Sequence, residues 1–255
     1  FKYLIQSIAY LAQSIYMKFM NRHGRWSVGY LQSNDWKNLD LKTIQVIKNQ
    51  PDQFLADPFL FQKNGLLYCF VEDYYYSSPL GRIRVFLLKD NTPIDLGIVL
   101  SEPFHLSYPN IFSVNGEVFM CPETSANNDI RLYKSTNFPH EWRLHKCLIQ
   151  NVSAADTNIF LYEGRWWLFT NIDSSDIGDH CSELHIFYSD QFDSINWIPH
   201  SKNPVICTSQ QSRNAGVINS TDGLFRSFQI QDFNFYGKSI GISKILLLTP
   251  DNYQE

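Results

Sequence analysis

The chain has 255 residues, of which 44% are hydrophobic and 15% aromatic, so it is long enough to bury a substantial core. Its 21 basic and 25 acidic residues give a net charge of −4 with no basic block, which argues against nucleic-acid binding through phosphate neutralisation. The five cysteines include no C-x-x-C pair, and Cys69, Cys121 and Cys147 fall in apolar strand patterns. We therefore expect the cysteines to be small core residues, with a structural disulfide or zinc site as the alternative. We predict no metal site and no cofactor.

Residues 1–22 are predicted as an N-terminal amphipathic helix or linker. Apolar residues recur at helical spacing from Leu4 through Ile8 and Leu11 to Ile15. Polar residues interrupt them, which argues against a membrane span, and no small-residue cleavage site marks a signal peptide. A helix packed on the rest of the protein or on a neighbouring domain is favoured, with a helix on a membrane surface as the alternative. A cytoplasmic or membrane-associated location is favoured over a secreted one.

Residues 23–255 contain one phrase four times. Each copy is a short polar or small segment, an apolar run, a glycine turn and a second apolar strand, with turns at Gly65, Gly116, Gly164 and Gly223. Each phrase predicts a β-hairpin. The spacing of roughly 50 to 60 residues is typical of a four-stranded propeller blade rather than a helical repeat. We therefore predict an all-β, five-bladed β-propeller over residues 23–255.

The strands can be assigned to blades in chain order. Blade one is predicted over 54–61, 66–73, 82–88 and 94–100, and blade two over 110–114, 118–122, 130–134 and 142–149. Blade three is predicted over 158–162, 166–171 and 183–189 with an outer strand near 197 or over 205–207, and blade four over 217–219, 224–230 and 239–248. The fifth blade is expected to be incomplete in this chain, with 26–32 and 43–48 as its available strands. Because an open ring would expose unpaired strand edges, we expect the natural protein to continue.

Polar residues recur at the ends of the inner strands. The innermost strand of each propeller blade lines the central channel, so Asp57, Glu123 and Asp156 should converge on one funnel. Several carboxylates at one cavity suit glycosidic bond cleavage, in which one is ionised as base or nucleophile and another is held protonated as acid. The competing interpretation is that each acid only bonds backbone amides and fixes a turn.

Two aromatic runs are candidates for stacking on sugar rings. Trp166 and Trp167 are adjacent in a strand, so one indole should face the channel side and the other the neighbouring blade, and at least one should be core. The run Tyr74 to Tyr76 follows an inner strand and is the better candidate for exposed stacking, with a solvated loop as the alternative.

Two resemblances extend this interpretation. Ala56-Asp57-Pro58 is similar to a phrase on blade one of the five-bladed propeller glycosidases, the arabinanase, β-xylosidase, levansucrase and invertase group, where the Asp acts as base or nucleophile. More closely, the chain resembles the propeller domain at the N-terminus of glucosamine inositolphosphorylceramide transferases and bacterial homologues linked to formyltransferase-like modules. The segments that carry this resemblance are 54–59, 105–109, 120–123, 155–157, 165–169, 203–205 and 236–237. Two arginine motifs depart from it, because Asn214 and Ser227 stand where the family usually has proline.

Together these observations predict a carbohydrate-active propeller in glycoconjugate or surface-polysaccharide metabolism, with a glycosidase-like or glycosyl-transferring site. Asp57 is predicted as base or nucleophile, Glu123 as acid and Asp156 as a modulating carboxylate. The resemblance implies a carbohydrate, nucleotide-sugar or glycolipid substrate and a linked or associated transferase domain. The alternative is a non-catalytic glycan-binding or scaffolding module fused to a transferase. The predicted substrate-binding residues are Glu72, His105, Tyr108, Trp166, Arg213, Arg226, Gln229 and Tyr236.

Overall fold

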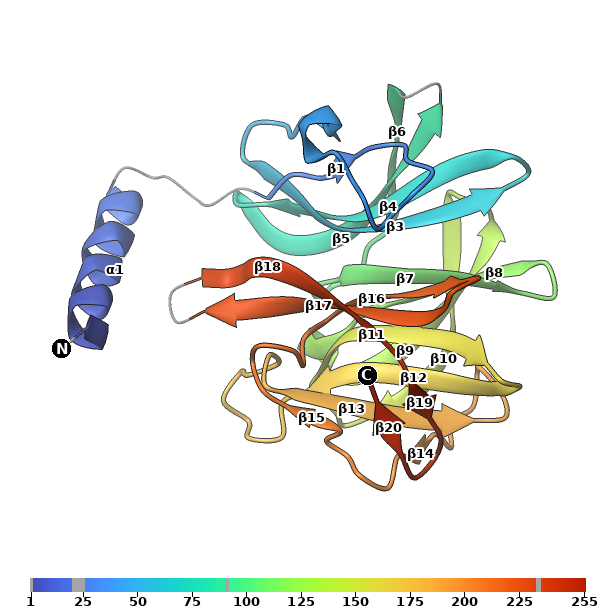
Figure 1. Cartoon of the computed structure of the whole chain (residues 1–255). Helices are drawn as coiled ribbons and strands as arrows, with labels where there is room; N and C mark the ends of the chain where they lie inside the picture. Colours follow the sequence, from blue (N-terminus) through green and yellow to red (C-terminus); the bar gives the residue numbers. More distant parts are fainter. Residues whose placement is uncertain (1, 20–25, 90–91, 233–234) are drawn as a thin grey trace.

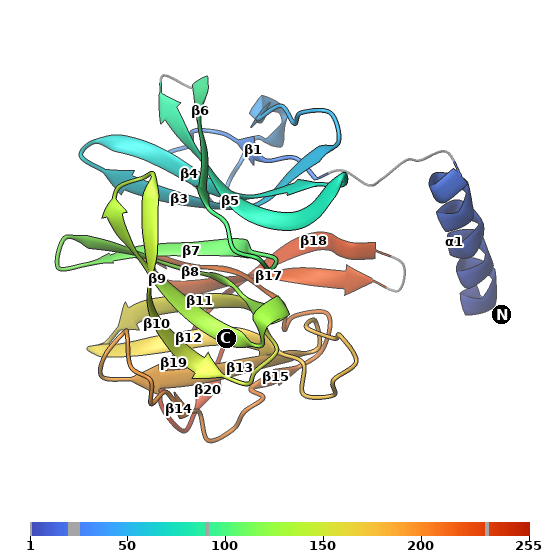
Figure 2. The ribbon, with the colours of Figure 1, turned by 180° about the vertical axis from the view of Figure 1, so that it is seen from behind.

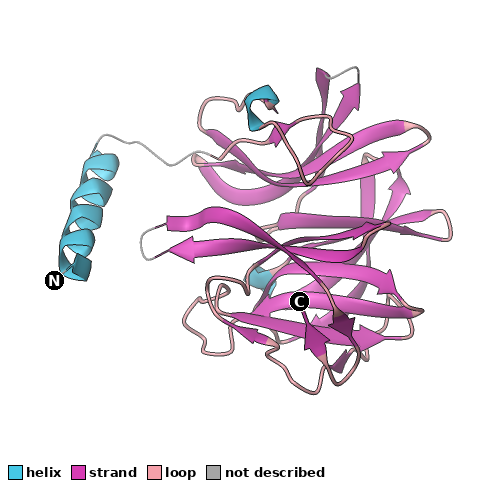
Figure 3. Cartoon of the chain, in the orientation of Figure 1, coloured by secondary structure: helices cyan, strands magenta, loops and turns pink. Residues whose placement is uncertain are grey.

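A computed structural model describes residues 2–19, 26–89, 92–232 and 235–255 (Figure 1). One helix, α1 (Lys2–Phe19), precedes twenty strands and two short 3-10 helices, η1 (Leu41–Thr43) and η2 (Ser125–Asn127), so the described chain is β-rich as predicted (Figure 3). The strands form antiparallel sheets in which neighbours along the chain pair with each other. The propeller arrangement expected from the repeated phrase is confirmed.

Each of the four repeated phrases forms the inner hairpin of one sheet. Blade one contains β3 (Gln53–Lys63), β4 (Leu66–Tyr75), β5 (Ser78–Lys89) and β6 (Thr92–Leu100). Blade two contains β7 (Ser107–Val114), β8 (Glu117–Glu123), β9 (Asp129–Asn137) and β10 (Glu141–Gln150). Blade three contains β11 (Ala154–Tyr162), β12 (Arg165–Ile172) and β13 (Glu183–Ser189), with β14 (Ile198–Pro199) and β15 (Ile206–Cys207) both paired to β13. Blade four contains β16 (Asn214–Ser220), β17 (Gly223–Asp232) and β18 (Phe235–Lys244).

The hydrophobic cores lie between consecutive blades. Phe70 of blade one packs in one cluster with Met120 of blade two. Leu132 of blade two shares a second cluster with Leu168 of blade three, and a third cluster joins blade three to Leu224 of blade four. Both faces of each middle sheet are therefore covered, which explains the high aromatic content of the strands. Cys69 and Cys121 are buried core residues as predicted, Cys147 is only partly buried, and all five cysteines are free.

The prediction of five blades is corrected to four among the described residues. The segment predicted as the third strand of blade four divides into β18 and β19 (Leu247–Leu248). β19 pairs with β20 (Tyr253–Gln254) in a short hairpin that packs in the core cluster between blades three and four. The two stretches expected to contribute to a fifth blade do form strands. They pair as β1 (Gly29–Tyr30) and β2 (Gln45–Val46), a two-stranded sheet rather than a blade.

The N-terminal segment that contains β1 and β2 bridges blade one and blade four. Val28 and Ile47 are buried against blade one, on the face opposite blade two. Farther along the segment, the Trp36 ring lies 5.2 Å from the ring of Phe225 in β17, and the Lys37 ammonium lies 2.5 Å from the Asp222 carboxylate in the blade-four turn. The segment thus occupies the sector between the last blade and the first.

Candidate functional site

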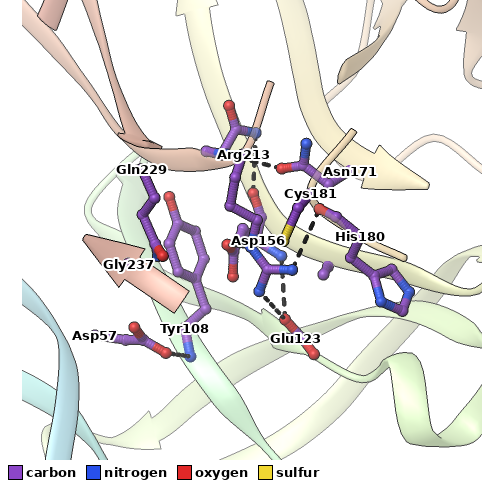
Figure 4. A network of polar contacts seen from close by, with 12 residues as sticks. Asp57, Tyr108, Glu123, Asp156, Asn171, His180, Cys181, Arg213, Gln229 and Gly237 are labelled. Carbon is purple, nitrogen blue, oxygen red and sulfur yellow. Dashed lines mark hydrogen bonds and ion pairs between the residues drawn. The ribbon is translucent and has the colours of Figure 1, made fainter. Parts of the chain in front are cut away.

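A backbone bulge recurs at the same place in the inner strand of the first three blades. The strand register breaks between Ala56 and Phe59 in β3, and at the equivalent positions in β7 and β11. The residues that open these bulges, Asp57, Tyr108 and Asp156, have φ values of 48°, 47° and 51°. A left-handed backbone costs a non-glycine residue about 1–3 kcal/mol and is typical of functional positions. The bulges re-aim these three side chains, and Figure 4 shows them approaching one another.

Arg213 organises two of the carboxylates. It lies just before β16, is 9% exposed, and contacts the Asp156 carboxylate through Nε. Its Nη2 lies 3.9 Å from Glu123 Oε2, and the same Glu123 oxygen accepts a hydrogen bond from the Asp156 backbone N–H at 3.2 Å (Figure 4). Burial raises the pKa of Asp156, and the adjacent guanidinium opposes that increase. Glu123 and Asp156 are therefore held as a pair by one buried cation.

Asp57 lies beside this pair with fewer partners. Its Oδ2 accepts a hydrogen bond from the Tyr108 backbone N–H at 3.3 Å. Burial raises the pKa of Asp57 to about 7, with smaller contributions from the negative charges of Glu72 and Glu123. A carboxyl group with a pKa of about 7 can give or accept a proton near neutral pH, which is the property required of a general acid or base.

Glu72 and His105 form a second, neighbouring pair. His105 Nε2 lies 3.1 Å from Glu72 Oε1, and the Gly81 backbone N–H donates to His105 Nδ1 at 3.0 Å. Because Nδ1 accepts that hydrogen bond, Nε2 carries the proton in the neutral ring and donates it to Glu72. Burial raises the pKa of Glu72, while the hydrogen bond from His105 opposes the increase.

A cavity of about 410 Å³ opens between blade one, blade four and the N-terminal segment. Asp57 and Glu72 contribute carboxyl groups to its wall, Gln229 contributes an amide, and Tyr236 and Trp26 contribute aromatic rings. The Tyr236 ring also lies 5.8 Å from the Arg213 guanidinium, so it connects the cavity to the carboxylate pair. The cavity is therefore lined by both acidic and aromatic residues.

Some of the predicted binding residues lie away from this cavity. Arg226 is fully buried and makes a bidentate contact with Glu255, with its Nη2 2.5 Å from Oε1. Trp166 packs between blades two and three against Phe112 and Phe192. The structure brings neither side chain to the carboxylates, because both are held in packing and ion-pair contacts elsewhere in the fold.

Other predicted residues are near the site in supporting positions. Tyr108 is buried, and its hydroxyl oxygen accepts a hydrogen bond from Asn158 Nδ2 at 2.7 Å. Tyr74 stacks on Phe54, which lines the cavity, with 4.7 Å between ring centroids. Tyr74 and Tyr76 thus form an aromatic cluster with Phe54, and Tyr75 lies instead against Arg82.

Sequence reasoning missed two contributors. Trp26 lines the cavity from the N-terminal segment, which carries no copy of the repeated phrase that marked the other site residues. Asn158 supports Tyr108, and its place in the third phrase, two residues after Asp156, was the available signal. Among the described residues, no group of three or more His, Cys, Asp or Glu side chains is arranged to hold a metal ion.

The fold defines a class, the β-propellers of the type found in glycoside hydrolases. Zg3597, a family 117 glycoside hydrolase from Zobellia galactanivorans, superposes with a TM-score of 0.56 at 13% identity, covering 75% of this chain and 66% of its own. The GH43 endo-arabinanase from Bacillus licheniformis gives a TM-score of 0.57 at 16% identity, covering 80% and 79%. At these identities the likeness concerns the fold alone.

Residues 22–255 match the family described as "Glucosamine inositolphosphorylceramide transferase 1, N-terminal", and the chain belongs to that family. Curated relatives named glucosamine inositolphosphorylceramide transferase 1 come from Oryza sativa subsp. japonica and Arabidopsis thaliana. They are 35% and 36% identical over 210 residues, or 80% of this chain. The chain spans 28% and 27% of their lengths. The family resemblance predicted from the sequence is confirmed.

Proposed function

We propose that this propeller binds carbohydrate in the cavity between blades one and four and acts on a glycosidic bond there, by hydrolysis or by transfer. The observation that carries the proposal is a cavity of about 410 Å³ lined by the acidic residues Asp57 and Glu72 together with the aromatic residues Tyr236 and Trp26. Ligand pockets of roughly 300–1,000 Å³ suit small molecules, with a few polar groups fixing orientation. The apolar face of a sugar ring would stack on Tyr236 or Trp26, and its hydroxyls would bond Glu72 and Gln229.

The proposed roles start from Asp57 as base or nucleophile. Its pKa of about 7 and its place at the cavity wall support proton exchange with a bound sugar. Asp156, ion-paired to Arg213, would act as the modulating carboxylate. Glu123 is the proposed acid, although Ser125 Oγ and the Asp156 N–H both donate hydrogen bonds to it. Those donors favour Glu123 as a hydrogen-bond acceptor rather than as a proton donor. The proposal therefore depends more on Asp57 than on Glu123.

The proposed ligand is a glycoconjugate, as a free saccharide, a nucleotide sugar or a glycolipid. The relatives' name refers to a transferase that acts on a ceramide lipid, and they extend well beyond the region matched here. We infer that the propeller works with a linked or associated transferase domain. Within this proposal, the two-stranded sheet of β1 and β2 stands in the sector that a fifth blade would occupy between blades four and one.

A second candidate function is glycan binding without catalysis, as a scaffolding module of a transferase. It is favoured by the contacts of Glu123 and Asp156, whose oxygens are engaged by Arg213, Ser125 and backbone N–H groups. In that case the cavity would position a glycan, and bond chemistry would take place in another domain.

A glycan array combined with a hydrolysis screen on activated aryl glycosides tests both candidates. Binding with turnover that is lost in Asp57→Asn supports the catalytic proposal. Binding without turnover, equal in wild type and variant, supports the scaffolding module. Binding to no glycan and turnover of no glycoside would overturn both.

A further inference from the structure

Helix α1 presents an apolar stripe that nothing in the described part of the chain covers. Leu4, Ile8, Leu11 and Ile15 recur at intervals of four, three and four residues, so they lie along one side of the helix. Their side chains are 61%, 58%, 60% and 62% exposed. Figures 1 and 2, seen from opposite sides, both place α1 apart from the sheets. The expected packing of this helix on the propeller is therefore not found.

The charge of the chain is divided unevenly around this helix. Residues 1–34 contain four basic residues, Lys2, Lys18, Arg22 and Arg25, and the first acidic residue is Asp35. The N-terminal part is thus basic, although the chain as a whole has a net charge of −4. The excess of acidic residues lies entirely in the region that forms the propeller. Such a separation gives the helix a local positive potential that the rest of the protein does not share.

An exposed apolar stripe combined with positive charge is the pattern of a helix that lies in the plane of a membrane surface. None of the helices in the described residues has the length and apolarity to cross a bilayer. We propose that α1 binds the headgroup region of a membrane that contains anionic lipid, with Leu4, Ile8, Leu11 and Ile15 in the acyl boundary. Two signals act together, because neither a short apolar stripe nor a few charges alone gives stable attachment.

Charge complementarity favours anionic lipid over a second copy of the chain as the occupant of this stripe. Two copies of α1 would bring two basic segments together, and neither segment has an acidic residue to pair with them. Anionic headgroups supply the missing negative charge, at about a fivefold gain in affinity for each Lys or Arg near the surface.

Membrane attachment of α1 would also hold the cavity close to lipid. Trp26, which lines the cavity, follows the end of α1 at Phe19 by seven positions in the sequence. An extended chain of that length reaches at most about 25 Å. This membrane proposal stands independently of the carbohydrate proposal, because it rests on α1 alone.

Vesicle co-sedimentation of the whole chain tests the proposal. Phosphatidylcholine vesicles are compared with vesicles that also contain phosphatidylglycerol, using wild type, Ile8→Glu and Gln6→Glu. Gln6 lies on the side of α1 opposite the stripe, so its substitution makes the same change in charge without entering the stripe. We expect wild type to bind the anionic vesicles, Ile8→Glu to lose at least tenfold in partitioning, and Gln6→Glu to lose no more than about fivefold, the effect of charge alone.

Three results would overturn the proposal. The first is failure of the wild-type chain to partition onto anionic vesicles, and the second is equal partitioning of wild type and Ile8→Glu. The third is a doubled mass in light scattering that Ile8→Glu abolishes, which would assign the stripe to a second copy of the chain. Melting temperatures of the two variants should match wild type, because α1 is separate from the propeller core.

Discussion

Asp57 combines a left-handed backbone conformation with a raised pKa. Replacing it with asparagine removes the carboxyl group while leaving a residue that tolerates the same backbone conformation. Asparagine adopts a φ of about +50° at least as readily as aspartate, so Asp57→Asn should fold. Loss of the carboxylate should lower turnover by about a hundredfold or more if Asp57 exchanges the proton. Steady-state rates on the best aryl glycoside measure this, with Asp190→Asn, an exposed acid of blade three, as the matched control. Unchanged turnover in Asp57→Asn would exclude the assigned role.

The raised pKa of Asp57 also predicts how stability depends on pH. The folded chain binds this proton up to about pH 7, whereas the unfolded chain releases it near pH 4. The contribution of Asp57 to stability is therefore fully present below about pH 4 and is lost as the pH rises through about 7. Asp57→Asn avoids that loss, so it should gain about 2–4 kcal/mol over wild type between pH 4 and pH 8. Urea unfolding at both pH values measures the difference, and an equal difference at the two would contradict the assignment.

Arg226 provides the contrasting case of a charge that serves the fold. Its guanidinium is 0% exposed and its partner Glu255 only 3%, so Arg226→Met leaves a buried carboxylate without its cation. We expect a loss of about 3–5 kcal/mol in the free energy of unfolding, with glycan affinity in the remaining folded protein unchanged. Denaturant unfolding and glycan titration distinguish this from a binding role, which would give weaker binding at wild-type stability.

At the scale of elements, the repeated phrase predicted more of the site than any single motif did. Asp57, Tyr108 and Asp156 occupy one position in three copies, and one bulge per copy gives them one backbone conformation. The position that is repeated in the sequence therefore brings these three side chains close together in the fold. Trp166 could not be placed in the same way. Strand alternation predicted opposite faces for Trp166 and Trp167, but both faces of that sheet are covered by neighbouring blades, so both indoles entered cores.

The β1 and β2 sheet makes its own prediction, because it is short and yet closes a sector of the ring. Ile47 follows β2 and is 3% exposed in the cluster with Leu55, whereas its neighbour Val46 is 55% exposed. Ile47→Ala should cost about 2–4 kcal/mol of unfolding free energy, and Val46→Ala less than about 0.5 kcal/mol. Thermal or denaturant unfolding of the pair tests whether the N-terminal segment is integral to the propeller. Equal, small effects would show that it is not.

At the scale of the whole molecule, the hairpins could be predicted and the number of blades could not. A hairpin is encoded by local alternation and a glycine turn, which the chain repeats with little change. The sector between blades four and one depends on contacts between segments far apart in the sequence, such as Trp36 with Phe225. No local sequence pattern predicts such contacts. The cavity lies in that sector. Its carboxylates belong to the repeated hairpins and could be predicted from them, whereas Trp26 belongs to the N-terminal segment and could not.

The central claim is that the cavity between blades one and four binds sugar. A crystal structure of the chain soaked with the glycan that binds best tests it most directly. The account predicts a sugar ring against Tyr236 or Trp26, with a hydroxyl or glycosidic oxygen within hydrogen-bond distance of Asp57. A glycan bound elsewhere on the propeller, with the cavity occupied only by solvent, would contradict it.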